Sequence, residues 1–153
     1  MKIQAYLHQS PIFAINSAYE GIITKINRQL KSDKLNLLQA LVLTSLFFEE
    51  HNDITPSKLA EIFETSRGNM SHILSALEYQ GYVKRVVNDK DARQFKIELK
   101  AEGRKKAITL IRFFDRLQEL FEKEVGENTC KKIVGGINHF SKIFKESKPS
   151  KHA

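Results

Sequence analysis

The chain of 153 residues is 41% hydrophobic and 28% charged, which suits one compact domain with an apolar core of its own. This composition excludes a disordered chain and a small disulfide scaffold. The longest nearly unbroken apolar run, Leu41–Phe48, is far shorter than the roughly 18 residues that a membrane-spanning helix needs. Polar residues and Pro11 interrupt the N-terminal stretch, so it lacks the apolar run of a signal peptide. We therefore expect a cytoplasmic protein that does not enter a membrane.

Basic residues outnumber acidic ones by 25 to 18, and this net charge of +7 favours a polyanionic partner such as nucleic acid or an anionic surface. The excess lies mainly in residues 105–153, which carry eleven basic and six acidic groups, so net charge alone does not locate a binding site. The single cysteine and the dispersed histidines predict no metal site. No spacing typical of a catalytic pair or a phosphate loop is present, so we expect neither an enzyme nor a cofactor.

Helical periodicity dominates both ends of the chain. Apolar residues at a spacing of 3.6 predict a helix over Ser10–Lys31 and a second, apolar on nearly all sides, over Leu35–Phe48. The same period returns in a long helix over Ala101–Val125 and in the apolar stripe of a final helix over Cys130–Phe144. These helices flank a central segment with a different pattern.

The central segment predicts a helix-turn-helix. Thr55 precedes a short helix that reaches about Phe63, and Ser66 is the expected cap of a second helix that ends at Gly81. The core-facing residues of that second helix, at i, i+3, i+4 and i+7, are Met70, Ile73, Leu74 and Leu77. Its opposite, polar face carries Gly68, His72, Ser75 and Tyr79, flanked by Asn69 and Ser71. Such a face suits the major groove, because asparagine can pair with adenine and Arg67 with guanine; the alternative is an ordinary solvated helix surface.

After Gly81 the period changes to two. Tyr82–Val87 and Phe95–Leu99 predict two strands that are joined by the polar loop Asn88–Gln94. A hairpin directly after a helix-turn-helix is the wing of a winged helix, and its tip can bring Lys90 or Arg93 to phosphates or the minor groove. The predicted fold is thus mostly α with a small β-hairpin.

Three short motifs lie in the order and spacing of one known family. They are Leu59 to Phe63 leading into Ser66 and Met70; Leu77-Glu78 followed by Gly81 to Arg85; and Asp91-Ala92-Arg93 followed by Leu99 and Gly103. Together they resemble the MarR-type winged-helix transcriptional regulators. The resemblance implies that Arg93 reaches the DNA backbone or minor groove, and that Arg85 and Asp91 brace the wing as a charge pair. Lys100 and Glu64 depart from the family pattern, which has threonine, and glycine or asparagine, at these positions.

The resemblance also implies a twofold homodimer, because the flanking helices carry more apolar surface than a winged helix of this size needs. We expect helical dimerisation regions over 1–34 and 101–146, a DNA-binding domain over 35–100 and a flexible basic tail over 147–153. The candidate interface residues are Phe13, Phe113, Phe114, Phe140 and Phe144.

The predicted function is sequence-specific binding of double-stranded DNA by a homodimeric transcriptional regulator, a repressor, on a pseudo-palindromic operator. Relatives often bind a small aromatic or anionic effector; whether this chain does so is left open, as is a winged-helix adaptor that binds protein instead. Cys130 is expected to be a buried, inert thiol rather than a redox switch. The predicted DNA-binding residues are Ser66, Arg67, Gly68, Asn69, Ser71, His72, Ser75, Arg85, Lys90, Asp91 and Arg93.

Overall fold

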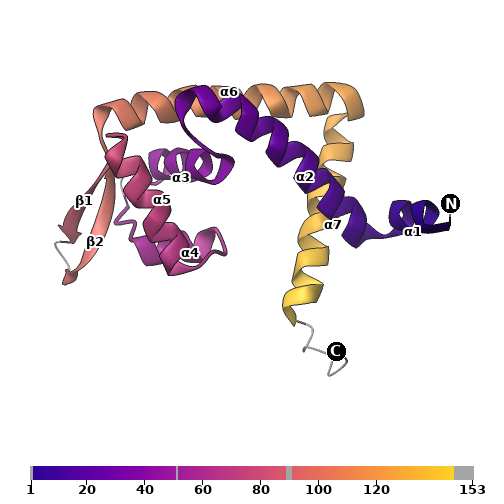
Figure 1. Cartoon of the computed structure of the whole chain (residues 1–153), viewed down its shortest axis with the longest axis horizontal. Coiled ribbons are helices and arrows are strands. Elements are labelled where there is room, and N and C mark those ends of the chain that lie inside the picture. Colours follow the sequence, from indigo (N-terminus) through magenta and orange to yellow (C-terminus); the bar gives the residue numbers. More distant parts are fainter. Residues whose placement is uncertain (1, 51, 89–90, 147–153) are drawn as a thin grey trace. The chain divides into compact units, whose positions relative to one another are not determined.

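The computed structural model describes residues 2–50, 52–88 and 91–146. Within these residues the chain is helical except for one antiparallel hairpin, which confirms the predicted fold class (Figure 1). The elements run in the order α1 (Lys2–Gln9), α2 (Pro11–Leu30), the 3-10 turn η1 (Lys31–Asp33), α3 (Leu37–Phe48), α4 (Pro56–Ile62), α5 (Arg67–Tyr79), β1 (Val83–Asn88), β2 (Asp91–Leu99), α6 (Ala101–Val125) and α7 (Glu127–Glu146).

The chain forms two compact units, Met1–Leu110 and Ile111–Ala153, and the boundary between them falls inside α6. The first unit contains α1 to α5, the hairpin and the first turns of α6. The second contains the rest of α6 and all described residues of α7. The helix-turn-helix and the wing therefore belong to one compact unit.

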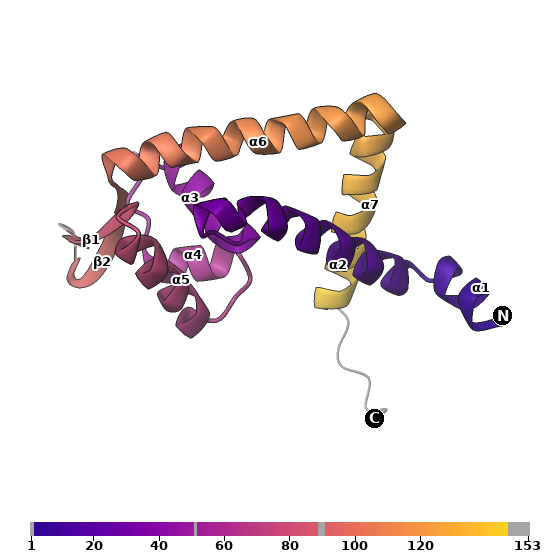
Figure 2. The ribbon, with the colours of Figure 1, turned by 45° about the horizontal axis from the view of Figure 1, so that its top comes forward.

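The core of the first unit lies among α3, α4, α5 and the hairpin. Because α3 is apolar on nearly all sides, it can pack centrally, as its sequence predicts. The hairpin lies beside α5 in both views (Figure 1, Figure 2). Side chains that are almost completely buried in this core include Val42, Leu43, Leu59, Met70, Leu74, Leu77, Val83 and Leu110.

Both helices of the helix-turn-helix begin with a side-chain cap. The Thr55 hydroxyl accepts from the Lys58 backbone N–H at 3.2 Å, and the Ser66 hydroxyl accepts from the Asn69 backbone N–H at 3.1 Å. Both predicted caps are therefore confirmed. Between the helices Glu64 adopts φ +48°, a left-handed conformation that explains why glycine or asparagine suits this position better.

The hairpin is longer than predicted. Val87 pairs with Phe95, but Asn88 then pairs with Asp91, so β2 begins inside the segment Asn88–Gln94 that was expected to be a loop. The prediction was wrong here because backbone pairing requires no apolar side chain, and the register shift after Val87 interrupts the alternation on which the prediction depended.

Close backbone approaches fix the ends of α5 and the start of α6. Gly81 adopts φ +77°, as expected after a helix end. At the C-cap of α5 the Gln80 side-chain amide donates to the Lys34 carbonyl at 2.9 Å, which links α5 to the segment before α3. Gly103 lies against Tyr82 so tightly that an added Cβ would come within 1.9 Å of the Tyr82 carbonyl oxygen.

The helix α1 was not predicted. It is short, it ends just before Pro11, and it packs on α2 through an edge-to-face contact between Tyr6 and Phe13, whose ring centroids are 5.9 Å apart. Eight residues carry too few apolar positions to reveal a period, so only the neighbouring α2 was visible in the sequence.

In the second unit α7 forms as predicted but buries none of its described residues in the single chain. Cys130 is consequently half-buried, which corrects the expectation of a buried thiol. Within this unit the exposed large apolar residues are Leu120, Phe121, Val125, Ile133, Val134, Ile137, Ile143 and Phe144. Such a set leaves a wide apolar surface uncovered.

Candidate nucleic-acid interface

The helix α5 separates a buried apolar face from an exposed polar one. The four residues predicted to face the core are all buried, between 0% and 4% exposed. The predicted outward-facing residues are exposed, and Tyr79 reaches 94% exposure. This exposed set consists of Ser66, Arg67, Gly68, Asn69, Ser71, His72, Ser75 and Tyr79. The structure thus brings most of the predicted site together on one helix.

Asn69 is partly oriented before any ligand binds. Its side-chain amide nitrogen donates to the Thr65 hydroxyl at 2.8 Å. One amide hydrogen and the amide oxygen remain for a partner such as the edge of an adenine. Thr65 had not been selected from the sequence, although its place four residues before Asn69 could have suggested the contact.

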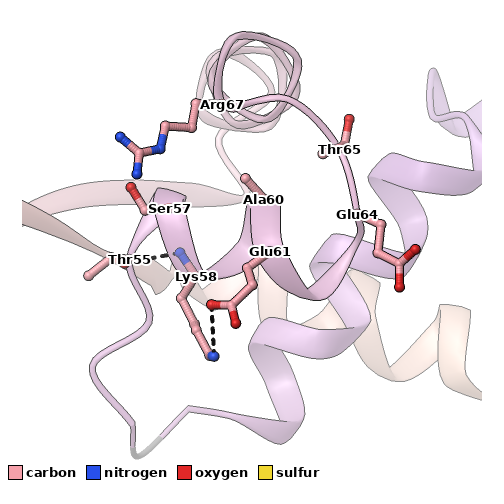
Figure 3. A pocket seen from close by; sticks show the side chains of 8 residues that line it. All are labelled: Thr55, Ser57, Lys58, Ala60, Glu61, Glu64, Thr65 and Arg67. Atoms are coloured by element: carbon pink, nitrogen blue, oxygen red, sulfur yellow. Dashed lines mark hydrogen bonds and ion pairs between the residues drawn. The ribbon is translucent and has the colours of Figure 1, made fainter. Parts of the chain in front are cut away.

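Residues of α4, of the turn after it and of the first turn of α5 line an open hollow of about 650 Å³ (Figure 3). Arg67 extends from the first turn of α5 toward Ser57 at the start of α4. On the other side Lys58 forms an ion pair with Glu61 at 3.0 Å. Among the described residues Arg67 has no ion pair, so its guanidinium is available to an anionic or hydrogen-bonding partner.

Arg85 is directed toward α5. Its Nη2 donates to the Ser75 hydroxyl at 2.9 Å and lies 3.4 Å from the Ser71 carbonyl oxygen, and its Nε lies 3.5 Å from a carboxylate oxygen of Glu78. Glu78 had not been predicted as part of the site, although it belongs to the Leu-Glu motif. The structure therefore places two predicted DNA contacts, Arg85 and Ser75, against each other.

The tip of the wing carries the remaining predicted residues. Lys90 lies outside the described residues. The backbones of Asp91 and Arg93 lie in β2, but their side chains are outside the described part of the structure. The DNA contact of Arg93 and the pairing of Asp91 with Arg85 therefore stay predictions.

The opposite face of the hairpin carries a charge network that was missed. Lys84 and Glu98 are direct cross-strand partners whose charged groups are 3.0 Å apart, and Lys96 lies 3.4 Å from the same carboxylate. The hydrogen bond from Lys84 is the main cause that lowers the pKa of Glu98, against a smaller opposing effect of burial. This pair could be found only from the register of the two strands, which the sequence did not determine.

None of the five predicted interface phenylalanines is fully buried in the single chain. Phe13 is 40% and Phe144 is 59% exposed. Phe113 packs against Phe114, and Phe140 against Phe144, with ring centroids 5.3 and 5.1 Å apart. Their role between two copies of the chain stays a prediction.

No three histidine, cysteine, aspartate or glutamate side chains in 2–50, 52–88 and 91–146 lie together in a way that could hold a metal ion. In the same residues no helix combines the length and apolarity required to cross a membrane.

The fold and the exposed helix define a winged helix-turn-helix. Residues 35–95 match the sequence profile of the MarR family, and these residues contain α3, α4, α5, β1 and the start of β2. This match bears out the resemblance to the MarR family that the motifs indicated.

The chain is similar in sequence to known transcriptional regulators. The HTH-type transcriptional regulator PrsX of Escherichia coli is 34% identical over 85 residues, which are 56% of this chain and 49% of PrsX. The transcriptional repressor MprA of E. coli K12 is 31% identical over 77 residues, 50% of this chain and 44% of MprA. The chain thus spans about half the length of these curated relatives.

A similar fold is found in the crystal structure of a complex of Staphylococcus aureus MepR with DNA. The superposition has a TM-score of 0.81 at 16% sequence identity and covers 88% of this chain and 96% of MepR. At this identity the likeness concerns the fold, which therefore extends beyond the winged helix to most of the chain.

Proposed function

We propose that this protein is a transcriptional regulator that binds double-stranded DNA with α5 in the major groove. The observation that carries the proposal is the division of α5 into a fully buried apolar face and an exposed face of short polar side chains. Short side chains let a helix approach base edges closely, and the neighbouring hairpin can follow the backbone on one side. MepR, whose fold is similar, has been crystallised with DNA.

The candidate contacts divide into two classes by chemistry. Asn69 and His72 lie exposed in the first half of α5 and can form directional hydrogen bonds to base edges. The wing residue Arg93 is a cation that suits phosphates or a narrow minor groove, and Arg67 can either act in the same way or pair with guanine. We propose that the first class determines sequence preference and that the second contributes mainly affinity.

We further propose that the regulator acts as a twofold homodimer. The helix α7 buries none of its described residues in the single chain, and the second unit exposes eight large apolar side chains. A second copy of the same chain would cover this surface symmetrically. Two recognition helices related by a twofold axis would then enter successive major grooves, which predicts a pseudo-palindromic site with half-sites about 10 bp apart.

The regulatory outcome we propose is repression, as in the relative MprA, whose name describes it as a transcriptional repressor. An effector molecule is not required for this proposal. Its presence would change the affinity for DNA without changing the contacts proposed for α5.

Duplex binding at several salt concentrations tests the proposal. Fragments enriched by the full-length chain from a random duplex pool are titrated and compared with a shuffled duplex of equal length. We expect tight binding to the enriched duplex and a steep decrease of log K with log salt concentration, since each neutralised phosphate contributes a slope of about −0.9. Weak association that depends on neither sequence nor salt would contradict the proposal and would favour the protein-binding adaptor.

A further inference from the structure

One side of α5 lies next to the first strand of the wing. Ser71, Ser75 and Glu78 stand at positions i, i+4 and i+7 of the helix, so they form a single stripe along it. The strand β1 brings Arg85 to this stripe, and the Arg85 side chain is only 31% exposed.

The Arg85 guanidinium contacts α5 through two of its nitrogens, Nη2 by hydrogen bonds and Nε by an ion pair alone. Nη2 donates to the Ser75 hydroxyl at 2.9 Å and approaches the Ser71 carbonyl at 3.4 Å, while Nε lies 3.5 Å from a Glu78 carboxylate oxygen without forming a hydrogen bond. The Arg85 backbone N–H lies 3.4 Å from the other Glu78 oxygen. The Ser75 hydroxyl in turn donates to the Ser71 carbonyl at 2.9 Å. One side chain of the hairpin thus contacts two successive turns of α5.

We infer that Arg85 is a positioning residue that holds the wing against the recognition helix, and that it does not itself contact DNA. This inference rests on the proposed function, because it describes how the two DNA-binding elements are kept in one arrangement. It also assigns Ser75 a structural role, since its hydroxyl is already engaged by Arg85 and by the Ser71 carbonyl. Base recognition is then left to the neighbouring face, which carries Gly68, Asn69 and His72.

The physical benefit of such a bridge is preorganisation. A hairpin that moved freely relative to α5 would have to be ordered when the duplex binds, and that ordering would reduce the affinity. With the bridge in place the wing tip and α5 meet the duplex as one surface. Loss of the bridge should therefore weaken binding without removing a phosphate contact.

Three variants of the full-length chain separate these roles in titrations with the enriched duplex. We expect Arg85→Ala and Arg85→Lys each to lower the affinity about tenfold with an unchanged salt slope, because neither side chain can place one nitrogen at Ser75 and another near Glu78. Ser75→Ala should add little to Arg85→Ala, since both remove the same bridge. The matched control is Lys84→Ala, which removes a cation from the opposite face of β1 and should leave the affinity within about twofold.

A contact between Arg85 and phosphate would give a different result. Arg85→Ala would then reduce the salt slope by about 1 per subunit and Arg85→Lys would restore most of the affinity; this outcome would overturn the inference. Unchanged affinity in Arg85→Ala would overturn it as well.

A measurement without DNA keeps the inference separate from the proposed function. Amide hydrogen exchange of the free protein should become faster in β1 and β2 of Arg85→Ala, while the amides of α3 keep their protection. Unchanged exchange in the hairpin would refute the bridge. If the unaltered chain binds no duplex, the proposed function fails, and the exchange experiment alone decides whether Arg85 positions the wing.

Discussion

The substitution Gly103→Ala tests how closely α6 packs against the segment that enters the wing. The added Cβ would lie 1.9 Å from the Tyr82 carbonyl oxygen and 2.8 Å from the Tyr82 carbonyl carbon. Contacts of this kind need more than 3 Å, so the backbone would have to move by about 1 Å or more. The carbonyl cannot move freely, because it accepts the backbone N–H of Lys100 at 2.9 Å.

The expected cost follows from these contacts. Overpacking costs about 1 to 3 kcal/mol, and weakening the Lys100 hydrogen bond costs about 1 kcal/mol more. The better helix propensity of alanine offsets about 1 kcal/mol. A net destabilisation of roughly 2 kcal/mol should lower the Tm by about 4 to 8 °C for a chain of this size.

Thermal unfolding followed by circular dichroism measures this shift, at equal protein concentrations because association would also raise the Tm. Gly21→Ala is the matched control: it lies inside α2, nothing is within 4 Å of its added Cβ, and it should be neutral or stabilising by up to about 1 kcal/mol. A Gly103→Ala variant as stable as the unaltered protein would refute the reasoning.

Four further measurements address the interface and the wing. Arg93→Ala should weaken binding to enriched and shuffled duplexes alike and reduce the salt slope by about 1 per subunit; an unchanged affinity would remove Arg93 from the interface. Asn69→Ala should cost about 1 to 3 kcal/mol on the enriched duplex and little on the shuffled one, and equal losses on both would exclude base recognition. Sedimentation equilibrium should show a dimer at micromolar concentration, which Phe144→Asp should shift toward the monomer; a monomer throughout would contradict the proposed assembly. The lowered pKa of Glu98 means that its ion pairs stabilise the fold above the pKa of the unfolded state, near 4.5, and that this contribution is lost as pH falls through the lower folded-state pKa. Glu98→Gln should therefore lose less stability than the unaltered chain between about pH 5 and pH 3 in urea titrations, and parallel pH profiles would argue against it.

The features that the sequence predicted well are determined by neighbours along the chain. Met70, Ile73, Leu74 and Leu77 are buried as expected, because helical spacing alone places them on one face. The caps at Thr55 and Ser66 are equally local, since each hydroxyl bonds to a backbone N–H three residues away. The motifs indicated the family for the same reason: they combine local signals in a fixed order.

The features that were missed depend on residues distant in sequence or on weak local signals. The direction of Arg85 depends on strand register and on a partner ten residues away, so its motif gave no means to distinguish a DNA contact from a bridge to Ser75. The start of β2 at Asp91 follows from backbone pairing, which polar side chains do not reveal. The half-buried state of Cys130 reflects how little of α7 one chain can cover.

The hydrogen bond from Gln80 to the Lys34 carbonyl has a consequence for the movement of α5. The helix has 13 residues and is therefore about 20 Å long, with its first turn held by the cap at Ser66 and its far end held by this bond. The helix is therefore held at both ends, and strain that displaces one end rotates it about the other. A displacement of about 1 Å at Gln80 tilts the axis by only about 3°, and Asn69, close to the pivot, then moves by a small fraction of an ångström. A shift of the segment before α3 would therefore move the end of α5 nearest Tyr79, while the side chains of the first turn would keep nearly the same position relative to a base.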